Sequence, residues 1–283
     1  MVYARSCDTA TTHDSLFAST PDDFVFLDPV CYRWRGTMTF HRGAELGAGS
    51  NATIYALESA DFPHTLCVAY VQREQQHITA TINRAARDCC MLRSVFIGMT
   101  GDRSVHLMQR MDGLLADLPD GAATPLRIVT DISRQLHCAY HGRGLIYLDL
   151  KMDNVMYTTG PNGNIVVRLI DLESFLPAND TTLACTYPAP EHRRSRGHLP
   201  RGDVCQPGVL FPFYSWLVGL LFAQLLGLDI DPLYFSNHDD IHPALRRLRG
   251  ALRTKKVPEP IVHLLHADPV HRTQFMELVG TDP

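Results

Sequence analysis

Residues 144–155 read Gly-Leu-Ile-Tyr-Leu-Asp-Leu-Lys-Met-Asp-Asn-Val, and this stretch determines how the rest of the chain is interpreted. It places Asp149 two residues before Lys151 and five before Asn154, and a second acid, Asp171, ends the apolar run of residues 165–170. A carboxylate can accept a proton, a lysine can neutralise negative charge, and amide and carboxylate oxygens suit Mg²⁺. The spacing is therefore typical of the chemistry that transfers a phosphoryl group.

This stretch resembles the catalytic loop of protein kinases, and two later motifs strengthen the resemblance. Residues 187–191, Tyr-Pro-Ala-Pro-Glu, match the motif that closes the kinase activation segment. Residues 268–273, Asp-Pro-Val-His-Arg-Thr, match a motif near the end of the large lobe, where the family pairs its arginine with the glutamate of the first motif. The resemblance covers about residues 40–280 and implies an α+β, two-lobed protein-kinase-like fold, with a small β-rich N-lobe and a larger helical C-lobe.

The resemblance also implies a role for each polar residue of the loop. Asp149 would be the general base, Lys151 would neutralise the transferring phosphoryl group, and Asn154 and Asp171 would hold Mg²⁺. A lysine two residues after the catalytic acid is the serine/threonine-kinase form. We therefore expect the γ-phosphate of ATP to move to a serine or threonine of a protein substrate.

A nucleotide site is expected in the N-lobe, because residues 46–55 resemble the kinase glycine-rich loop. Glycines let backbone amides approach phosphate oxygens without a Cβ in the way. The phosphates would lie under Gly47, Ala48, Gly49 and Ser50, and the adenine would lie between the apolar side chains of Leu46, Ile54 and Ala69.

The lysine that kinases carry in the small lobe is missing. Lys151 is the first lysine of the chain, and Val71 stands where the family pattern Val-Ala-Ile-Lys has its lysine. Arg73 lies two residues further on and so on the same face of an extended strand, and we expect it to contact the phosphates instead. Asp88 occupies the position of the lysine's acidic partner, although a solvated helix face explains it equally well.

Three further departures affect the C-lobe. Tyr147-Leu148 replaces His-Arg, which removes the pocket that reads a phosphorylated activation loop. Asp171-Leu172-Glu173 replaces Asp-Phe-Gly, and Tyr214 stands where an aspartate usually anchors the catalytic loop.

These departures leave two alternatives open. A pseudokinase that regulates a protein partner would explain the missing lysine, Glu173 and Tyr214. A small-molecule phosphotransferase would explain the sequence Ile-Asp-Leu-Glu at residues 170–173, which resembles that of aminoglycoside and choline phosphotransferases.

Composition limits the partners and the compartment. The 283 residues are 45% apolar and carry a net charge of −4, which provides no general field for nucleic acid or an anionic membrane. Residues 204–228 lack charge and are long enough to cross a bilayer, but a buried central helix explains them better. The eight cysteines show no metal or disulfide spacing, so we expect an intracellular protein, cytoplasmic or nuclear, in a host cell if its source is viral. The oligomeric state is not predicted.

Residues 1–35 show no clear periodicity and are expected to form a flexible extension, and the resemblance implies an N-lobe over 36–111 and a C-lobe over 112–283. The expected elements are a β-hairpin over 41–57, strands at 65–73, 104–109, 155–157 and 165–170, and helices at 79–92 and 126–141.

Overall fold

The computed structural model describes most of the chain, in two compact units, residues 1–111 and 112–283. The described residues are 16, 21–28, 31–36, 38–48, 52–60, 66–72, 85–86, 88–89, 91–160, 162–171, 174–177, 189–191, 207–234 and 241–278.

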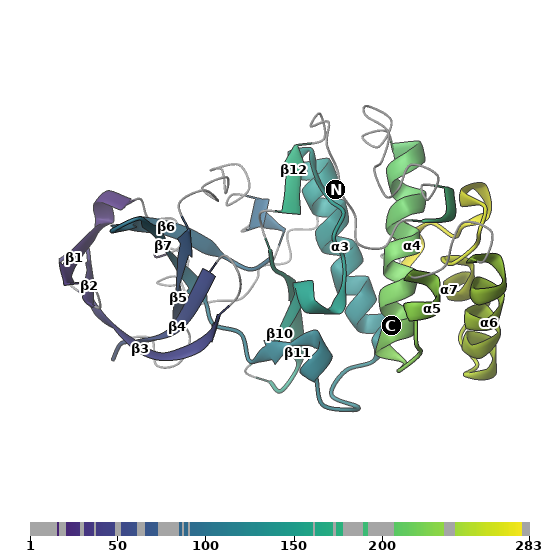
Figure 1. The fold of residues 1–283 in the computed structure, drawn as a ribbon, viewed down its shortest axis with the longest axis horizontal. Helices are drawn as coiled ribbons and strands as arrows, with labels where there is room; N and C mark the ends of the chain where they lie inside the picture. The colour runs from purple at the N-terminus through teal and green to yellow at the C-terminus, as the bar shows by residue number, and fades with distance from the viewer. Residues whose placement is uncertain are drawn as a thin grey trace. The chain divides into compact units, whose positions relative to one another are not determined.

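The N-terminal unit is a seven-stranded antiparallel sheet with the strand order β1-β2-β3-β4-β5-β7-β6 (Figure 1). The strands are β1 Phe24–Asp28, β2 Cys31–Trp34, β3 Met38–Ala48, β4 Ala52–Glu58, β5 Leu66–Gln72, β6 Ser94–Thr100 and β7 Arg103–Gln109. The sheet curls, and the short helix η1 (Pro21–Asp23), which precedes β1, contacts β6 at the opposite edge.

Alternating side chains divide this sheet into two faces. Val68 and Tyr70 on β5, with Val105 and Leu107 on β7, contribute to one hydrophobic core. Because side chains alternate along a strand, Ala69 and Val71 belong to the other face of β5, where they too are buried. Strand β5 therefore carries no charged side chain on either face.

The expectation that residues 1–35 form a flexible extension is wrong for residues 21–34. Strands β1 and β2 pair with each other, and β2 pairs with β3. Tyr32 and Trp34 are buried in the core of the sheet. Burial of these large aromatic side chains holds the two strands in place.

The C-terminal unit is built around two 19-residue helices, α3 Pro125–Arg143 and α4 Pro207–Leu225, which pack against each other. Its other helices are η3 Leu115–Asp117, η4 Met152–Asn154, α5 Asp231–Tyr234, α6 Ile241–Thr254, α7 Glu259–His263, η7 Pro269–His271 and η8 Phe275–Leu278. Two small sheets accompany them, one of β11 (Ile165–Leu169), β10 (Val155–Thr159) and β8 (Gly113–Leu114), and one of β12 (Phe175–Pro177) and β9 (Leu145–Tyr147).

Helix α4 forms the core of this unit. By length and apolar composition it could cross a bilayer, but 67% of it is buried inside the structure. Ser215 connects α4 to η8, because its hydroxyl donates to the Phe211 carbonyl of α4 at 2.9 Å and accepts from the Phe275 amide of η8 at 2.9 Å. A hydrophobic helix with this much burial is adequately explained as a core element.

Most expected elements are present, with boundaries shifted by a few residues. The predicted helix at 126–141 is α3, and the hairpin at 41–57 is β3 and β4. Strand β6 was not expected, and the predicted helix at 79–92 lies largely outside the described residues. Among the described cysteines, Cys31 and Cys67 are free thiols.

Candidate active site

Helix α3 delivers the chain into the catalytic loop. Thr124 caps its N-terminus by accepting the Arg127 amide at 3.3 Å, and Pro125 suits the first helical position. The helix ends at Gly144, whose left-handed φ of 62° a glycine adopts without strain. The chain then enters the buried strand β9 and, after Leu148, reaches Asp149.

Asp149, Lys151 and Asn154 converge within this loop. The Asp149 Oδ2 accepts hydrogen bonds from Lys151 Nζ at 2.7 Å and from Asn154 Nδ2 at 2.9 Å. The same Asn154 amide donates to the Asp149 carbonyl at 2.8 Å. Two donors on one carboxylate oxygen fix the orientation of the Asp149 side chain, as a group that accepts a proton requires.

The charge of Lys151 is held in place by its neighbours. Burial lowers the pKa of Lys151, but the hydrogen bond and charge of Asp149, together with Asp171 and Asp153, outweigh burial and raise it overall. The ammonium therefore stays protonated through the physiological range, in an ion pair with Asp149 at 2.7 Å. Such a cation can compensate negative charge that arrives with a substrate.

Two buried tyrosines hold the loop by hydrogen bonds. The Tyr214 hydroxyl on α4 accepts the backbone amide of Tyr147 at 2.9 Å, and the Tyr147 hydroxyl donates to the Ile170 carbonyl at 3.1 Å. Burial, and then the charges of Asp171 and Asp149, raise the pKa of Tyr147 well above its ordinary value. Burial also raises the pKa of Tyr214. Both hydroxyls are therefore neutral, and the hydrogen bonds that join the loop to α4 and to Ile170 involve no charged group.

A second segment brings Asp171 toward the loop. The Ile170 amide donates to the Asn154 carbonyl at 3.0 Å, which places the end of β11 beside η4. Gln135 on α3 holds β11, because its amide donates to the Val167 carbonyl at 2.9 Å and accepts the Leu169 amide at 3.0 Å. Asp171 itself has a positive φ of 56°, which is uncommon for a residue with a side chain.

The residues of this segment suit a hard divalent cation. Asn154 and Asp171 offer amide and carboxylate oxygens, which Mg²⁺ prefers, and they lie on adjacent segments. The Asp171 carboxylate is on an exposed residue and accepts a hydrogen bond from the Ser174 hydroxyl. Among the residues that the structure describes, no cluster of three or more His, Cys, Asp or Glu side chains forms an all-protein metal site. This fits an ion held by few protein groups together with a phosphate-bearing ligand.

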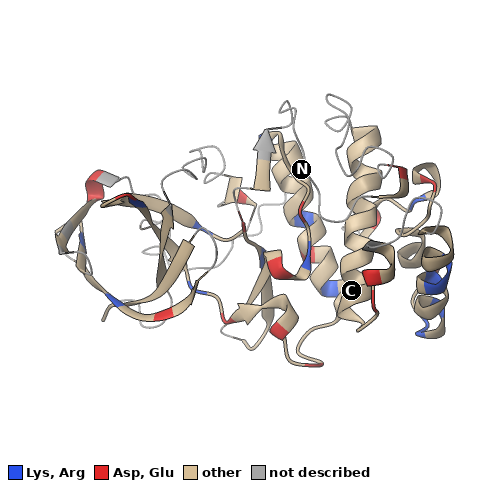
Figure 2. Ribbon diagram, in the orientation of Figure 1, with Lys and Arg blue, Asp and Glu red and all other residues tan. Residues whose placement is uncertain are grey.

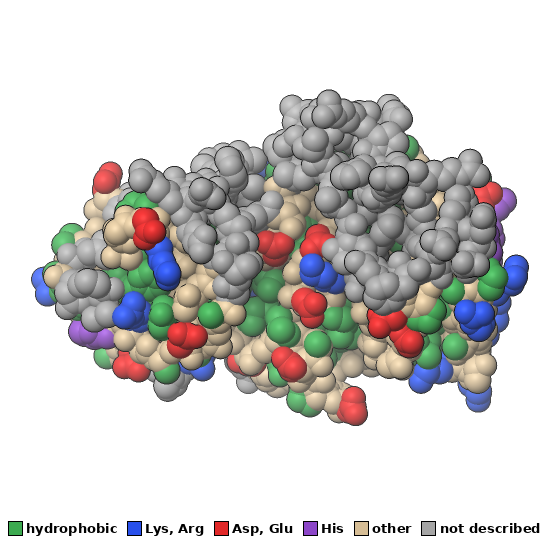
Figure 3. Space-filling model, viewed as in Figure 1, with side chains coloured by type: hydrophobic (Ala, Val, Ile, Leu, Met, Phe, Trp, Pro, Cys, Tyr) green, Lys and Arg blue, Asp and Glu red, His purple; other side chains and the backbone are tan. Residues whose placement is uncertain are grey.

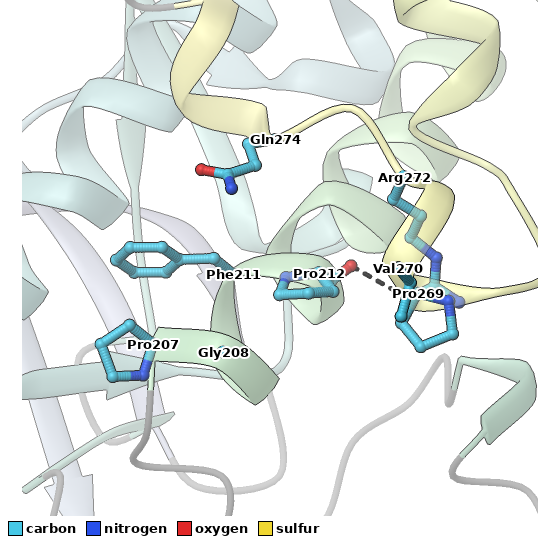
Figure 4. Close-up of a pocket in the computed structure, with 8 residues that line it drawn as sticks. All are labelled: Pro207, Gly208, Phe211, Pro212, Pro269, Val270, Arg272 and Gln274. Carbon is cyan, nitrogen blue, oxygen red and sulfur yellow. Dashed lines mark hydrogen bonds between the residues drawn. The ribbon is translucent and has the colours of Figure 1, made fainter.

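The expected ion pair between Glu191 and Arg272 is present. Arg272 Nη1 lies 2.6 Å from Glu191 Oε1, and Nη2 lies 2.5 Å from Oε2. Arg272 also donates to the Pro212 carbonyl at 3.0 Å, beside a hollow of about 280 Å³ (Figure 4). The hollow is lined by Pro207, Gly208, Phe211, Pro212, Pro269, Val270, Arg272 and Gln274. It contains none of the catalytic-loop residues, so the pair is a structural tie rather than part of the reacting centre.

In the N-terminal unit, the expected nucleotide-contacting residues form a row across three strands. Gly47 on β3 pairs with Ile54 on β4, and Ile54 pairs with Ala69 on β5. Leu46 has 45% of its surface exposed, as an apolar wall open to a ligand would. Ala48 ends β3, and Gly49, Ser50 and Arg73 lie outside the described residues.

Val71 is 8% exposed, so an apolar side chain fills the position of the family's lysine. It lies opposite Ser104 on β7, and Ala69 lies opposite His106. His106 Nε2 is 3.1 Å from the Ser104 hydroxyl, its Nδ1 has no hydrogen-bond partner, and burial lowers its pKa to about 4. The described part of this face therefore carries no charge at neutral pH.

Three contributors to the site were not predicted from the sequence. Gln135, Ser174 and the hydroxyl of Tyr147 act through contacts with the backbone or with Asp171. The one available signal was Gln135 itself, a polar residue whose position falls on the buried side of α3. Asp88 is exposed, and Leu172 and Glu173 lie outside the described residues.

Comparison with known proteins identifies the fold. No family model matches the sequence, and no curated protein matches it. Among solved structures, the kinase PK-1 of Cydia pomonella granulovirus is similar, with a TM-score of 0.60, 16% identity, and coverage of 85% of this chain and 92% of that one. The chain has a protein-kinase-like fold.

Two further solved structures are similar to this chain. The ROP18 kinase domain, solved in complex with AMP-PNP and sucrose, gives a TM-score of 0.54 at 19% identity, over 86% of this chain and 78% of that one. ROP2 from Toxoplasma gondii, a virulence factor with a protein-kinase fold and no enzymatic activity, gives 0.59 at 15% identity over the same shares. The two-lobed α+β prediction is therefore confirmed, and the fold alone does not establish enzymatic activity.

Proposed function

We propose that this protein transfers the γ-phosphoryl group of ATP to a serine or threonine hydroxyl of a protein substrate. The observation that carries the proposal is the Asp149 carboxylate, held by Lys151 at 2.7 Å and Asn154 at 2.9 Å. A fixed carboxylate beside a protonated lysine is the pair of groups that phosphoryl transfer to a hydroxyl requires.

In this reaction Asp149 accepts the proton of the attacking hydroxyl as the oxygen bonds to the γ-phosphorus. The bond from that phosphorus to the bridging oxygen breaks, and ADP leaves. Lys151 compensates the charge on the transferring group. Mg²⁺, when bound by Asn154 and Asp171, would supply charge neutralisation at the phosphates.

The nucleotide site is proposed in the N-terminal unit. Leu46, Ile54 and Ala69 would contact the adenine, and the backbone of residues 47–50 would contact the phosphates. The AMP-PNP complex of the similar ROP18 kinase domain supports nucleotide binding. Arg73 is proposed as the cation that replaces the lysine missing at Val71.

The test measures phosphate incorporation from labelled ATP with Mg²⁺ into a generic serine/threonine substrate, with Asp149→Asn in parallel. Loss of a general base lowers a rate by about 10²–10⁴-fold, so the variant should lose nearly all incorporation. Thermal unfolding of both proteins would show whether the variant folds. Equal incorporation by the two proteins would exclude Asp149 as the base.

A pseudokinase that regulates a protein partner is the second candidate, and buried Val71 is the observation that favours it. The inactive ROP2 shows that this fold exists without enzymatic activity. Folded wild-type protein that binds ATP but incorporates no phosphate would support this candidate. Retained ATP binding by Arg73→Ala would separately exclude Arg73 as the replacement cation.

A further inference from the structure

Helix α6 has two faces of opposite character. Ile241, Ala244, Leu245, Leu248 and Leu252 are buried and attach the helix to the C-terminal unit. The opposite side carries arginines. Figure 2 shows the ribbon of α6 largely blue, and Figure 3 shows blue side chains gathered at this end of the unit. We call Arg246, Arg247, Arg249 and Arg253, with Lys255 and Lys256 just beyond the helix, the basic face of α6.

The basic face has a regular geometry. Arg246, Arg249 and Arg253 are spaced three and four residues apart, which aligns them in one stripe along the helix. Arg247 flanks the stripe, and Arg246, Arg247 and Arg253 are exposed. The helix of 14 residues is about 21 Å long, enough to lie along about six residues of an extended peptide.

The charge of this segment opposes that of the whole protein. Residues 241–258 contain four arginines, two lysines and no acid. The net charge of the chain is −4, so the rest of the chain carries −10 against the +6 of this segment. Such an asymmetry concentrates a positive field at one surface.

Little within the described structure compensates these cations. Arg253 pairs with Glu259, with Nε at 2.6 Å and Nη2 at 3.0 Å from its oxygens. Among the described residues, Arg246, Arg247 and Arg249 have no carboxylate within ion-pair distance. Burial and then the charge of Arg253 lower the pKa of Arg249, and its buried Nε has no hydrogen-bond partner. Like charges at this spacing destabilise a helix, so the arrangement is costly without an external anion.

We propose that the basic face of α6 binds an acidic segment of a partner protein. An extended nucleic acid or an anionic membrane is attracted by a general positive field, and the chain as a whole carries −4. Residues 241–256 contain no Phe, Tyr or Trp on which a base could stack. A short acidic peptide needs only the length of one helix, and carboxylates accept the paired hydrogen bonds of arginine.

This inference is independent of the proposed phosphotransfer. The basic face lies outside the catalytic loop, and its test measures binding. It holds equally for a kinase that docks a substrate and for an inactive protein that holds a partner.

The test is fluorescence anisotropy with a fluorescein-labelled decapeptide of alternating Glu and Ser, and with a matched peptide in which Gln replaces Glu. The variant is Arg246→Glu with Arg247→Glu. The matched control is Arg103→Glu with Arg127→Glu, which changes the net charge equally at exposed positions on β7 and α3. A single-stranded oligonucleotide of equal charge and anionic phosphatidylserine vesicles form the other arms.

We expect the acidic peptide to bind and the Gln peptide not to bind. The α6 variant should weaken binding by about tenfold or more, the control by less than about twofold, and higher salt should weaken binding to the wild type. Equal loss in the control variant, or equal binding of both peptides, would overturn the proposal. Tighter binding of the oligonucleotide or the vesicles would overturn the assignment to an acidic protein segment. Unfolding curves of both variants ensure that a loss reflects the surface.

Discussion

The catalytic loop and strand β5 both depart from the protein-kinase pattern, and the structure accommodates the two departures differently. In the loop, Tyr214 replaces an acid, yet its hydroxyl still accepts the Tyr147 amide at 2.9 Å. On β5, Val71 replaces a lysine. Its cross-strand neighbours are Ala52 on β4 and Ser104 on β7, and the neutral His106 lies opposite Ala69. A residue whose role is to accept a hydrogen bond can be replaced by an uncharged acceptor. A residue that binds phosphate through its positive charge can be replaced only if another cation takes over that role.

The largest effect on stability is expected from breaking the ion pair of the C-terminal unit. Arg272→Ala leaves the Glu191 carboxylate without the guanidinium that binds both of its oxygens. Arg272 is fully buried but the Glu191 side chain keeps 23% of its surface exposed, so the loss should lie at or below the value of about 3–5 kcal/mol for a fully buried pair, and urea denaturation measures it. The exposed pair of Arg253 and Glu259 is the control, because Arg253→Ala should leave the free energy of unfolding nearly unchanged. A similar decrease in the free energy of unfolding in both variants would mean that the ion pair of Arg272 stabilises the fold no more than an exposed pair.

The second prediction tests whether the face of β5 and β7 that carries Val71, Ser104 and His106 is uncharged. The pKa of His106 is lowered from 6.5 to about 4, so below pH 6.5 the unfolded chain binds a proton that the folded chain does not. Stability should fall by about 3 kcal/mol as the pH falls from 6.5 to 4. In His106→Leu this loss should shrink, leaving the smaller contribution of His137, whose pKa burial also lowers. Urea denaturation at several pH values measures the free energy of unfolding, and His41→Leu, at an exposed position, is the control. If the free energy of unfolding depends on pH equally in His106→Leu and in the wild type, His106 takes up its proton in the folded protein as well.

The smallest decrease in stability is expected from removing the Tyr214 hydroxyl, the hydrogen-bond acceptor of the catalytic loop. Tyr214→Phe keeps the packing of a fully buried ring and removes only the acceptor of the Tyr147 amide. An unsatisfied buried amide costs about 1–3 kcal/mol, and any phosphotransfer rate should fall with it because the loop loses its support. Tyr157→Phe on β10, for which the described structure contains no side-chain hydrogen bond, should change neither quantity. A stable Tyr214→Phe protein would mean that the tyrosine serves packing alone.

The sequence predicted those parts of the site in which residue identity and spacing carry the chemistry. Asp149, Lys151 and Asn154 lie within six residues of one another, so their convergence follows from local chain geometry. The pair of Glu191 and Arg272 spans 81 residues and was predicted only because both belong to family motifs. The two-lobed architecture followed from the same resemblance.

The remainder depended on tertiary contacts that leave little trace in sequence. Gln135 contacts β11 from a helix more than thirty residues earlier, and its residue type is equally common on solvated helix faces. Strands β1 and β2 are only 5 and 4 residues long, so their alternation was too brief to detect. The role of Arg73 remains a prediction, because the residue lies outside the described part of the chain.

The two hydrogen bonds of Gln135 have a consequence beyond the position of Asp171. Strand β11 is the last strand of its three-stranded sheet, and it is buried against α3, so its outer backbone groups meet neither a fourth strand nor open solvent. The Gln135 amide occupies the Val167 carbonyl and the Leu169 amide as a neighbouring strand would. One side chain thereby takes the place of a missing strand, and Gln135→Ala should lower the free energy of unfolding in urea denaturation because both buried backbone groups lose their partner.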